Sequence, residues 1–202
     1  MILVTTVLSI AFFGRIPAKA LGLVPPRSWT QTWETLSILL VAILVSTFGF
    51  RYRGDWQFNR LRKTIGAVLP VSKSERWWFA AVGIGAGVSE ELLYRGFLIY
   101  YLWVWLPGLD WTQRTVVSSL VFGLGHLYQG WKGILGTTAY GFCFAWLYAG
   151  SGSLLIPMAI HAAVDLRILA ILTPKRVRLL EQENGAALAA PQTEILARND
   201  CP

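Results

Sequence analysis

Long apolar runs separated by short polar connections constrain this chain more than any other feature. The runs cover residues 33–50, 77–104, 115–128, 133–148 and 154–172. Helix-breaking residues such as Pro70, Pro107 and Gly150 lie between them. A membrane-spanning helix needs about 20 mostly apolar residues. Repeated runs of this kind therefore predict several helices that cross a lipid bilayer.

The shortest candidate span covers residues 2–13, at the start of the chain. Ala18-Lys19-Ala20 resembles the cleavage site of a signal peptide, but no basic residue precedes the run, so a retained first helix is favoured over a removed leader. We predict an all-α, polytopic transmembrane bundle of about six spans, with its functional site between helices. The bundle would occupy residues 1–172, with its core at 70–172, and residues 173–202 would form a polar, flexible tail.

The composition supports an integral membrane protein. Charged residues make up 14% of the chain, against about 25% in soluble domains. A soluble helical bundle with a very apolar core is the alternative, and the recurrence of uncharged runs disfavours it. The net charge of +7 comes from basic residues between apolar runs rather than from a basic amphipathic face, which argues against nucleic acid as a partner.

The distribution of basic residues predicts the orientation. Seven of them lie between the runs 33–50 and 77–104: Arg51, Arg53, Arg60, Arg62, Lys63, Lys73 and Arg76. Because cytoplasmic loops are enriched in Lys and Arg, the loop 51–76 and the C-terminus should be cytoplasmic in a multi-pass plasma-membrane protein of bacterial type. Arg15, Lys19 and Arg27 would then lie on the opposite side, against the rule.

Ionisable residues inside the apolar runs are the strongest functional signal. They are Glu90, Glu91, Arg95, His126, His161, Asp165 and Arg167. An ionisable side chain at the bilayer centre costs about 2.5 to 3.5 kcal/mol, so such residues usually face the bundle interior and have a function. Capping by Ser89 or snorkelling by an arginine would explain single members of the set. No structural need explains two glutamates, an aspartate and both histidines of the chain together.

The spacing of these residues suggests hydrolytic chemistry. Glu90 and Glu91 point about 100° apart around a helix, so one can face a reaction centre while the other pairs with Arg95 one turn away. His161 and Asp165 share a helix face, so Asp165 can orient His161 or line the same cavity. A glutamate that takes a proton from water and histidines that stabilise an oxyanion suffice to hydrolyse an amide.

These residues resemble the motifs of the CPBP family, the CAAX-processing and bacteriocin-processing (Abi-type) intramembrane proteases. The family patterns EExxxR, FxxxH and HxxxN or HxxxD correspond to Glu90 to Arg95, Phe122 to His126 and His161 to Asp165. The resemblance covers about residues 70–170. It implies a glutamate-type endopeptidase in which Glu90 activates water, His126 assists, and His161 with residue 165 forms the oxyanion site. Asp165 stands where eukaryotic members have Asn, so it is either protonated or orients His161.

Three alternatives remain open at this stage. Glu90, His126 and His161 would also suit a catalytic zinc ion, although the chain lacks HExxH and a metal-free route without any cofactor is favoured. A transporter or proton relay also uses intramembrane carboxylates and histidines, but no paired repeats are visible. A silent immunity or scaffold protein would not need intact motifs. The expected partners are the bilayer and a peptide or lipidated-protein substrate.

Overall fold

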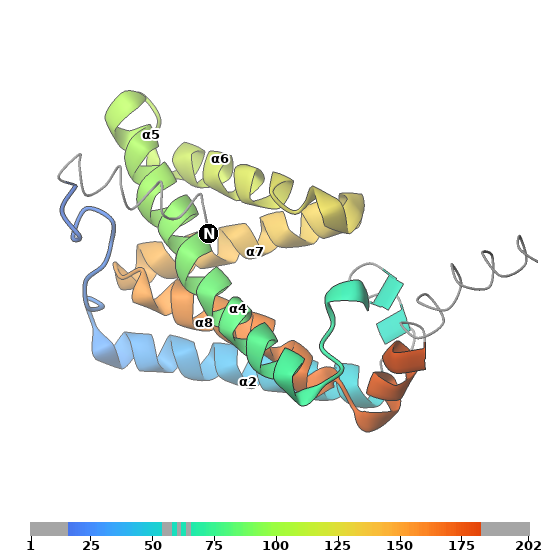
Figure 1. Cartoon of the computed structure of the whole chain (residues 1–202). Coiled ribbons are helices and arrows are strands. Elements are labelled where there is room, and N and C mark those ends of the chain that lie inside the picture. Colours follow the sequence, from blue (N-terminus) through green and yellow to red (C-terminus); the bar gives the residue numbers. More distant parts are fainter. Residues whose placement is uncertain (1–15, 54–57, 60–61, 64–65, 183–202) are drawn as a thin grey trace, which may run out of the picture. The chain divides into compact units, whose positions relative to one another are not determined.

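The computed structural model describes residues 16–53, 58–59, 62–63 and 66–182, and all regular structure within these ranges is helical (Figure 1). The prediction of an all-α fold is confirmed for this part of the chain. Its elements are α2 (Trp29–Arg53), η1 (Gly66–Val68), α4 (Lys73–Glu91), η2 (Leu92–Leu98), α5 (Ile99–Trp105), α6 (Trp111–Leu124), η3 (Leu127–Gln129), α7 (Gly130–Ser151) and α8 (Leu155–Ile171). The candidate first helix over residues 2–13 lies outside the described residues.

Each of the five later apolar runs corresponds to helical structure, but the helices differ in their suitability as spans. Within the described residues, Trp29–Tyr52 is the one helix that is long and apolar enough to cross a membrane alone. Helix α8 and the following helix Pro174–Gln182 are long and apolar enough only when they are taken together as one span. The chain bends by 82° between them. Helix α6 has 14 residues, which corresponds to about 21 Å, less than the bilayer's apolar thickness of about 30 Å. The number of six spans stays a prediction.

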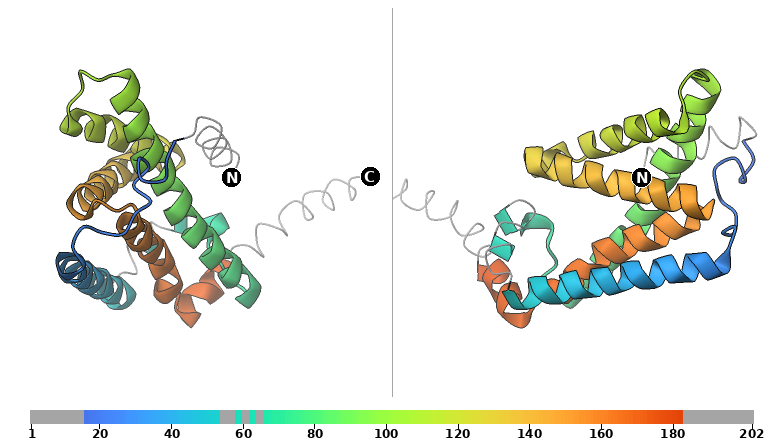
Figure 2. Two further views of the ribbon diagram at one scale, coloured as in Figure 1. Left: turned by 90° about the vertical axis from the view of Figure 1, so that its left-hand side faces the viewer. Right: turned by 180° about the vertical axis from the view of Figure 1, so that it is seen from behind.

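The chain divides into two compact units, one formed by Met1–Leu44 with Val82–Leu166, the other by Val45–Ala81 with Arg167–Pro202. In the first unit, α6 and α7 lie side by side, as the two views of Figure 2 show. A Cβ atom on Gly141 would lie only 3.1 Å from the Cα of Ser119. Small residues thus let the backbones of α6 and α7 approach closely, as is common between helices in membranes.

Helices α4 and α8 also meet closely in the first unit. A Cβ atom on Gly87 would lie 2.7 Å from the backbone nitrogen of Ala162, which is closer than real Cβ contacts allow. Glycine at position 87 is therefore required by the space between two backbones. Because Glu90 and Glu91 follow one turn later, this crossing sets the distance between them and α8.

The second unit contains an apolar cluster and a set of arginines at the end of α8. Phe58, Leu69, Leu172 and Leu180 form the cluster. Three arginines donate to consecutive carbonyl groups: Arg76 to Leu169 (2.9 Å), Arg51 to Ala170, and Arg176 to Ile171 (3.0 Å). The last carbonyls of a helix have no partner within the helix and carry partial negative charge. The arginines therefore both satisfy these groups and stabilise the C-terminus of α8.

The start of the expected polar tail belongs to this unit. Residues Pro174–Gln182 form a helix, and Leu180 is only 1% exposed because it packs in the cluster. Residues 183–202 lie outside the described ranges. The division of the chain into a bundle and a flexible tail stays a prediction.

Candidate active site

The helix that carries both glutamates changes its winding directly after them. Helix α4 ends at Glu91 and continues as the π-helical segment η2, Leu92–Leu98, before α5 begins. π-Helical turns are rare and occur frequently at functional sites. Arg95 lies in this segment and is completely buried.

Glu91 and Arg95 form a buried ion pair. Nη1 of Arg95 donates to Oε1 of Glu91 at 2.7 Å, and both side chains are 0% exposed. Nη2 of Arg95 donates to the carbonyl oxygen of Gly141 on α7 at 3.0 Å. The guanidinium carbon lies 4.4 Å from the centre of the Phe122 ring, which suits a cation–π contact. The pairing expected from the four-residue spacing is present.

The same Glu91 oxygen holds His161 on α8. Nδ1 of His161 lies 2.8 Å from Oε1 of Glu91. Because an ionised carboxylate can only accept, Nδ1 carries the proton and donates it. The His161 ring stacks on Phe144 at 4.7 Å between centroids, with an interplanar angle of 17°, and meets Phe122 edge-on. Three neighbours therefore determine the orientation of the ring.

This geometry changes one expectation for Asp165. Its Oδ2 atom lies 3.8 Å from Nε2 of His161, beyond hydrogen-bond distance. The orienting hydrogen bond comes instead from Glu91, because the close crossing of α4 and α8 brings that carboxylate to Nδ1. Asp165 lies on the opposite side of the imidazole, next to the nitrogen that remains available.

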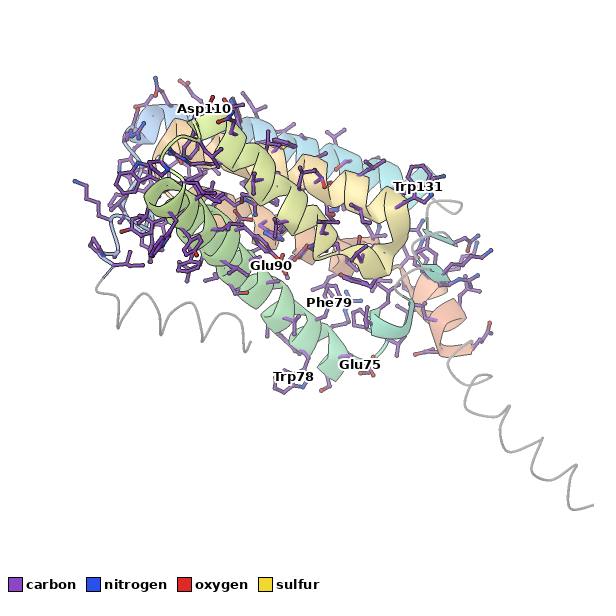
Figure 3. All side chains as sticks on the ribbon, turned by 90° about the horizontal axis from the view of Figure 1, so that it is seen from above. Glu75, Trp78, Phe79, Glu90, Asp110 and Trp131 are labelled. Carbon is purple, nitrogen blue, oxygen red and sulfur yellow. The ribbon has the colours of Figure 1, made fainter. Side chains whose placement is uncertain are left out.

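Glu90 has a different environment from Glu91. Its side chain is 31% exposed, and its Oε2 atom lies 3.9 Å from Nε2 of His161. It also lies within electrostatic reach of His126 and Asp165. Figure 3 shows the Glu90 side chain leaving the later part of α4, while Trp78 and Glu75 lie near the start of that helix. Of the two adjacent glutamates, only Glu90 has a partly exposed side chain, and its Oε2 atom is buried without a hydrogen-bond partner among the described residues.

The apolar run 115–128 suggested that His126 lies within a helix. In the structure it lies just beyond the end of one. Helix α6 ends at Leu124, Gly125 caps it, and His126 precedes the short turn η3. Nδ1 of His126 lies 2.9 Å from the carbonyl oxygen of Phe122, so the side chain can satisfy one of the last carbonyls of α6. The rings of His126 and Phe122 are 4.9 Å apart. Phe122 thus contacts both histidines.

Residues 72–167 match the family model described as "Type II CAAX prenyl endopeptidase Rce1-like". This segment is similar to the Rce1-like family. The matched range contains Glu90, His126, His161 and Asp165. The family is a membrane-embedded protease family. Neither a search of curated proteins nor a search of solved structures gives a significant match.

The structure brings most of the predicted residues of the Rce1-like segment together. Glu90, Glu91, Arg95, His161 and Asp165 form one connected group. Phe122 joins it through Arg95 and His161, and His126 adjoins it through Phe122. The roles of the individual residues in catalysis are a separate question.

The Rce1-like site also includes two residues of α7 that sequence reasoning missed. Phe144 supports the face of His161, and the carbonyl of Gly141 accepts from Arg95. Neither is ionisable, and both lie within an apolar run. A phenylalanine and a glycine in such a run give no signal that separates them from ordinary packing residues.

A three-ligand metal site was the alternative for these residues. Throughout the ranges that the structure describes, no three His, Cys, Asp or Glu side chains are arranged to hold a metal ion. His161 has one nitrogen bonded to Glu91, which leaves Nε2 as its possible metal ligand. The choice between a metal-free route and zinc held by Glu90, His126 and His161 stays a prediction.

Proposed function

We propose that this protein is an intramembrane endopeptidase that hydrolyses a peptide bond of a membrane-associated substrate, with Glu90 activating the water. The unequal environments of Glu90 and Glu91 carry this proposal. Glu90 is partly exposed beside His161, whereas Glu91 is 0% exposed and bonded to two side chains. A general base must reach water, so only Glu90 is suited to that role.

In the proposed reaction Glu90 accepts a proton from water as the water oxygen attacks the carbonyl carbon of the substrate. A tetrahedral intermediate forms, and its oxygen carries the negative charge. The carbon–nitrogen bond then breaks, and Glu90 returns the proton to the leaving amine. One carboxylate thus serves first as base and then as acid, which balances the protons over the cycle.

Glu91 and Arg95 would act by holding His161. Glu91 accepts from both cationic side chains through Oε1. Since Arg95 is anchored to Gly141, the carboxylate has a fixed position and keeps Nδ1 of His161 protonated. These two residues are therefore positioning residues, and the buried pair is not itself expected to touch the substrate.

His161 would stabilise the oxyanion through Nε2–H. Because Nδ1–H already donates to Glu91, Nε2 carries a hydrogen only when the ring is an imidazolium. Glu90 and Asp165 have carboxylate oxygens at 3.9 and 3.8 Å from Nε2, and nearby negative charge favours that form. We assign Asp165 the role of stabilising the imidazolium, since an ionised aspartate cannot donate to an oxyanion. His126 would help to hold the water near Glu90.

The proposed chemistry needs no cofactor. The carboxylate and the imidazolium supply the proton acceptor and the charge stabilisation that a metal-bound water would otherwise provide. The substrate would be a CAAX-like C-terminal segment of a lipidated protein, or a bacteriocin-like peptide. The six-span arrangement, with the loop 51–76 and the C-terminus in the cytoplasm, is part of the same proposal.

The test compares two fluorogenic peptides with the same CAAX sequence, one farnesylated and one unmodified, and identifies the products by mass spectrometry. Purified protein should cut at least one of them, and Glu90→Gln should lower the rate by about 10²-fold or more because Gln cannot accept a proton. Glu34→Gln, at an exposed glutamate of α2, is the matched control and should retain the full rate. Equal rates in the two variants would remove Glu90 from the role of base.

A further inference from the structure

A cavity lies in the first unit, next to the π-helical segment. Its volume is about 570 Å³, and α5, the start of α6 and the segment before α2 contribute to its walls. Arg95 forms part of this wall as well as pairing with Glu91. Glu90 and the histidines do not line it.

The charged side chains of this cavity are all cationic. They are Lys19, Arg95 and Arg114, and none of the described residues that line the cavity is acidic. Arg95 is fully buried, and its Nε has no hydrogen-bond partner among the residues that the structure describes. The Nε of Arg114 is also buried, with no hydrogen-bond partner in the described part of the chain. Buried donors of this kind normally have an acceptor, so the cavity has the properties of an anion-binding site.

The remaining walls are aromatic. Tyr100, Trp103 and Trp111 line the cavity, and the two tryptophans are 55% and 42% exposed. Trp105, at the end of α5, is 67% exposed. Exposed tryptophan and tyrosine in a membrane protein are typical of the level of the lipid headgroups. The cavity therefore combines cations with the side chains that favour the membrane interface.

We propose that this cavity binds the phosphate of an anionic phospholipid headgroup. Lys19, Arg95 and Arg114 hold the phosphate, and Trp103 and Trp111 contact the glycerol and the upper acyl chains. Inorganic phosphate also carries negative charge, but it has no apolar group that could contact the aromatic walls. Lys19, which contradicts the expected charge asymmetry, then has a specific partner.

The test measures lipid binding to delipidated protein by native mass spectrometry, with phosphatidylglycerol and phosphatidylcholine as probes. Lys19→Gln with Arg114→Gln removes two positive charges from the cavity. Lys175→Gln with Arg178→Gln removes two from exposed positions elsewhere. Each cation near an anionic lipid contributes enough for about a fivefold effect, so the cavity variant, which lacks two, should bind phosphatidylglycerol about 25-fold more weakly. The control variant should bind it like the wild type, and phosphatidylcholine should bind weakly to all three.

Equal losses in the two double variants would overturn the proposal, because they would show a general effect of charge. Equal affinity of the wild type for the two lipids would overturn it as well. Displacement of the lipid by inorganic phosphate at equal concentration would show that the site takes free phosphate rather than a lipid. Circular dichroism shows whether the double variant folds. If it does not, Lys19→Gln alone is used, because it changes only an exposed side chain. It should weaken phosphatidylglycerol binding about fivefold, and an unchanged affinity would contradict the proposal.

Discussion

Oε1 of Glu91 lies 2.8 Å from Nδ1 of His161, a residue 70 positions later in the chain. This contact joins the helix that carries the glutamate pair to the helix that carries the last motif. The two glutamates therefore differ in environment. Glu91 is buried and bonded to other side chains, whereas the Glu90 side chain is 31% exposed. The relationship leads to predictions that separate loss of structure from loss of chemistry.

Arg95→Ala should lower the stability of the protein as well as its activity. Removing one member of a buried ion pair is costly, about 3 to 5 kcal/mol, because the buried Glu91 carboxylate then keeps only His161 as a partner. The measurement is thermal unfolding in detergent, with the yield of folded protein as a second readout. Glu90→Gln is the comparison, since it should abolish cleavage with little change in unfolding temperature. An Arg95→Ala protein that unfolds like the wild type would show that the pair does not contribute to folding.

Phe144→Leu should reduce turnover more than stability. Leucine conserves most of the apolar volume, and such exchanges usually cost less than about 1.5 kcal/mol, but it removes the flat face that supports His161 at 4.7 Å. Because a small misplacement of a catalytic group is costly, kcat should fall by about tenfold or more. Phe142→Leu, at an exposed position of the same helix, should leave kcat unchanged. A similar kcat in both variants would contradict a positioning role for Phe144.

Contacts between residues close in sequence could be predicted, whereas contacts between residues far apart in sequence could not. Glu91 and Arg95 are four residues apart on one helix, so their pairing could be predicted from helix geometry. The bond between Glu91 and His161 could not, because the relative rotation and depth of α4 and α8 depend on the packing at Gly87. The spacing alone therefore left two roles open for Asp165, which could orient His161 or line the same cavity. The end of α6 before His126 was missed because Gly123 and Gly125 lie in a run that remains apolar on both sides.

Gly87→Ala tests the crossing of α4 and α8 directly. The added Cβ would lie 2.7 Å from the backbone nitrogen of Ala162, so the helices must separate. Overpacking of this kind costs about 1 to 3 kcal/mol, and activity should fall because Glu91 moves away from His161. Gly85→Ala is the matched control on the same helix, since nothing lies within 4 Å of its added Cβ. It should be neutral or slightly stabilising, because alanine favours a helix over glycine by about 1 kcal/mol.

The two glycine variants can be compared by thermal unfolding and by cleavage rate in the same preparation. A Gly87→Ala protein that is as stable and active as Gly85→Ala would show that α4 and α8 are further apart than 2.7 Å implies. A protein that loses activity but keeps its stability would instead show that the helices move without loss of packing, which still ties the crossing to the site.

The last prediction concerns metal content, which distinguishes the two chemistries considered for Glu90, His126 and His161. If Glu90 acts on water directly, protein purified without added metal should contain far less than one zinc per chain by elemental analysis. Chelators should leave its cleavage rate unchanged. A zinc site would require three side chains to reach within about 2.0 to 2.2 Å of one point, and His161 could contribute only Nε2 because its Nδ1 is bonded to Glu91. Cys143 is an exposed thiol, so Cys143→Ser controls for zinc bound outside the site. One stoichiometric zinc that persists in Cys143→Ser, and is lost together with activity in His126→Ala and His161→Ala, would defeat the metal-free mechanism and leave the assignment as a protease intact.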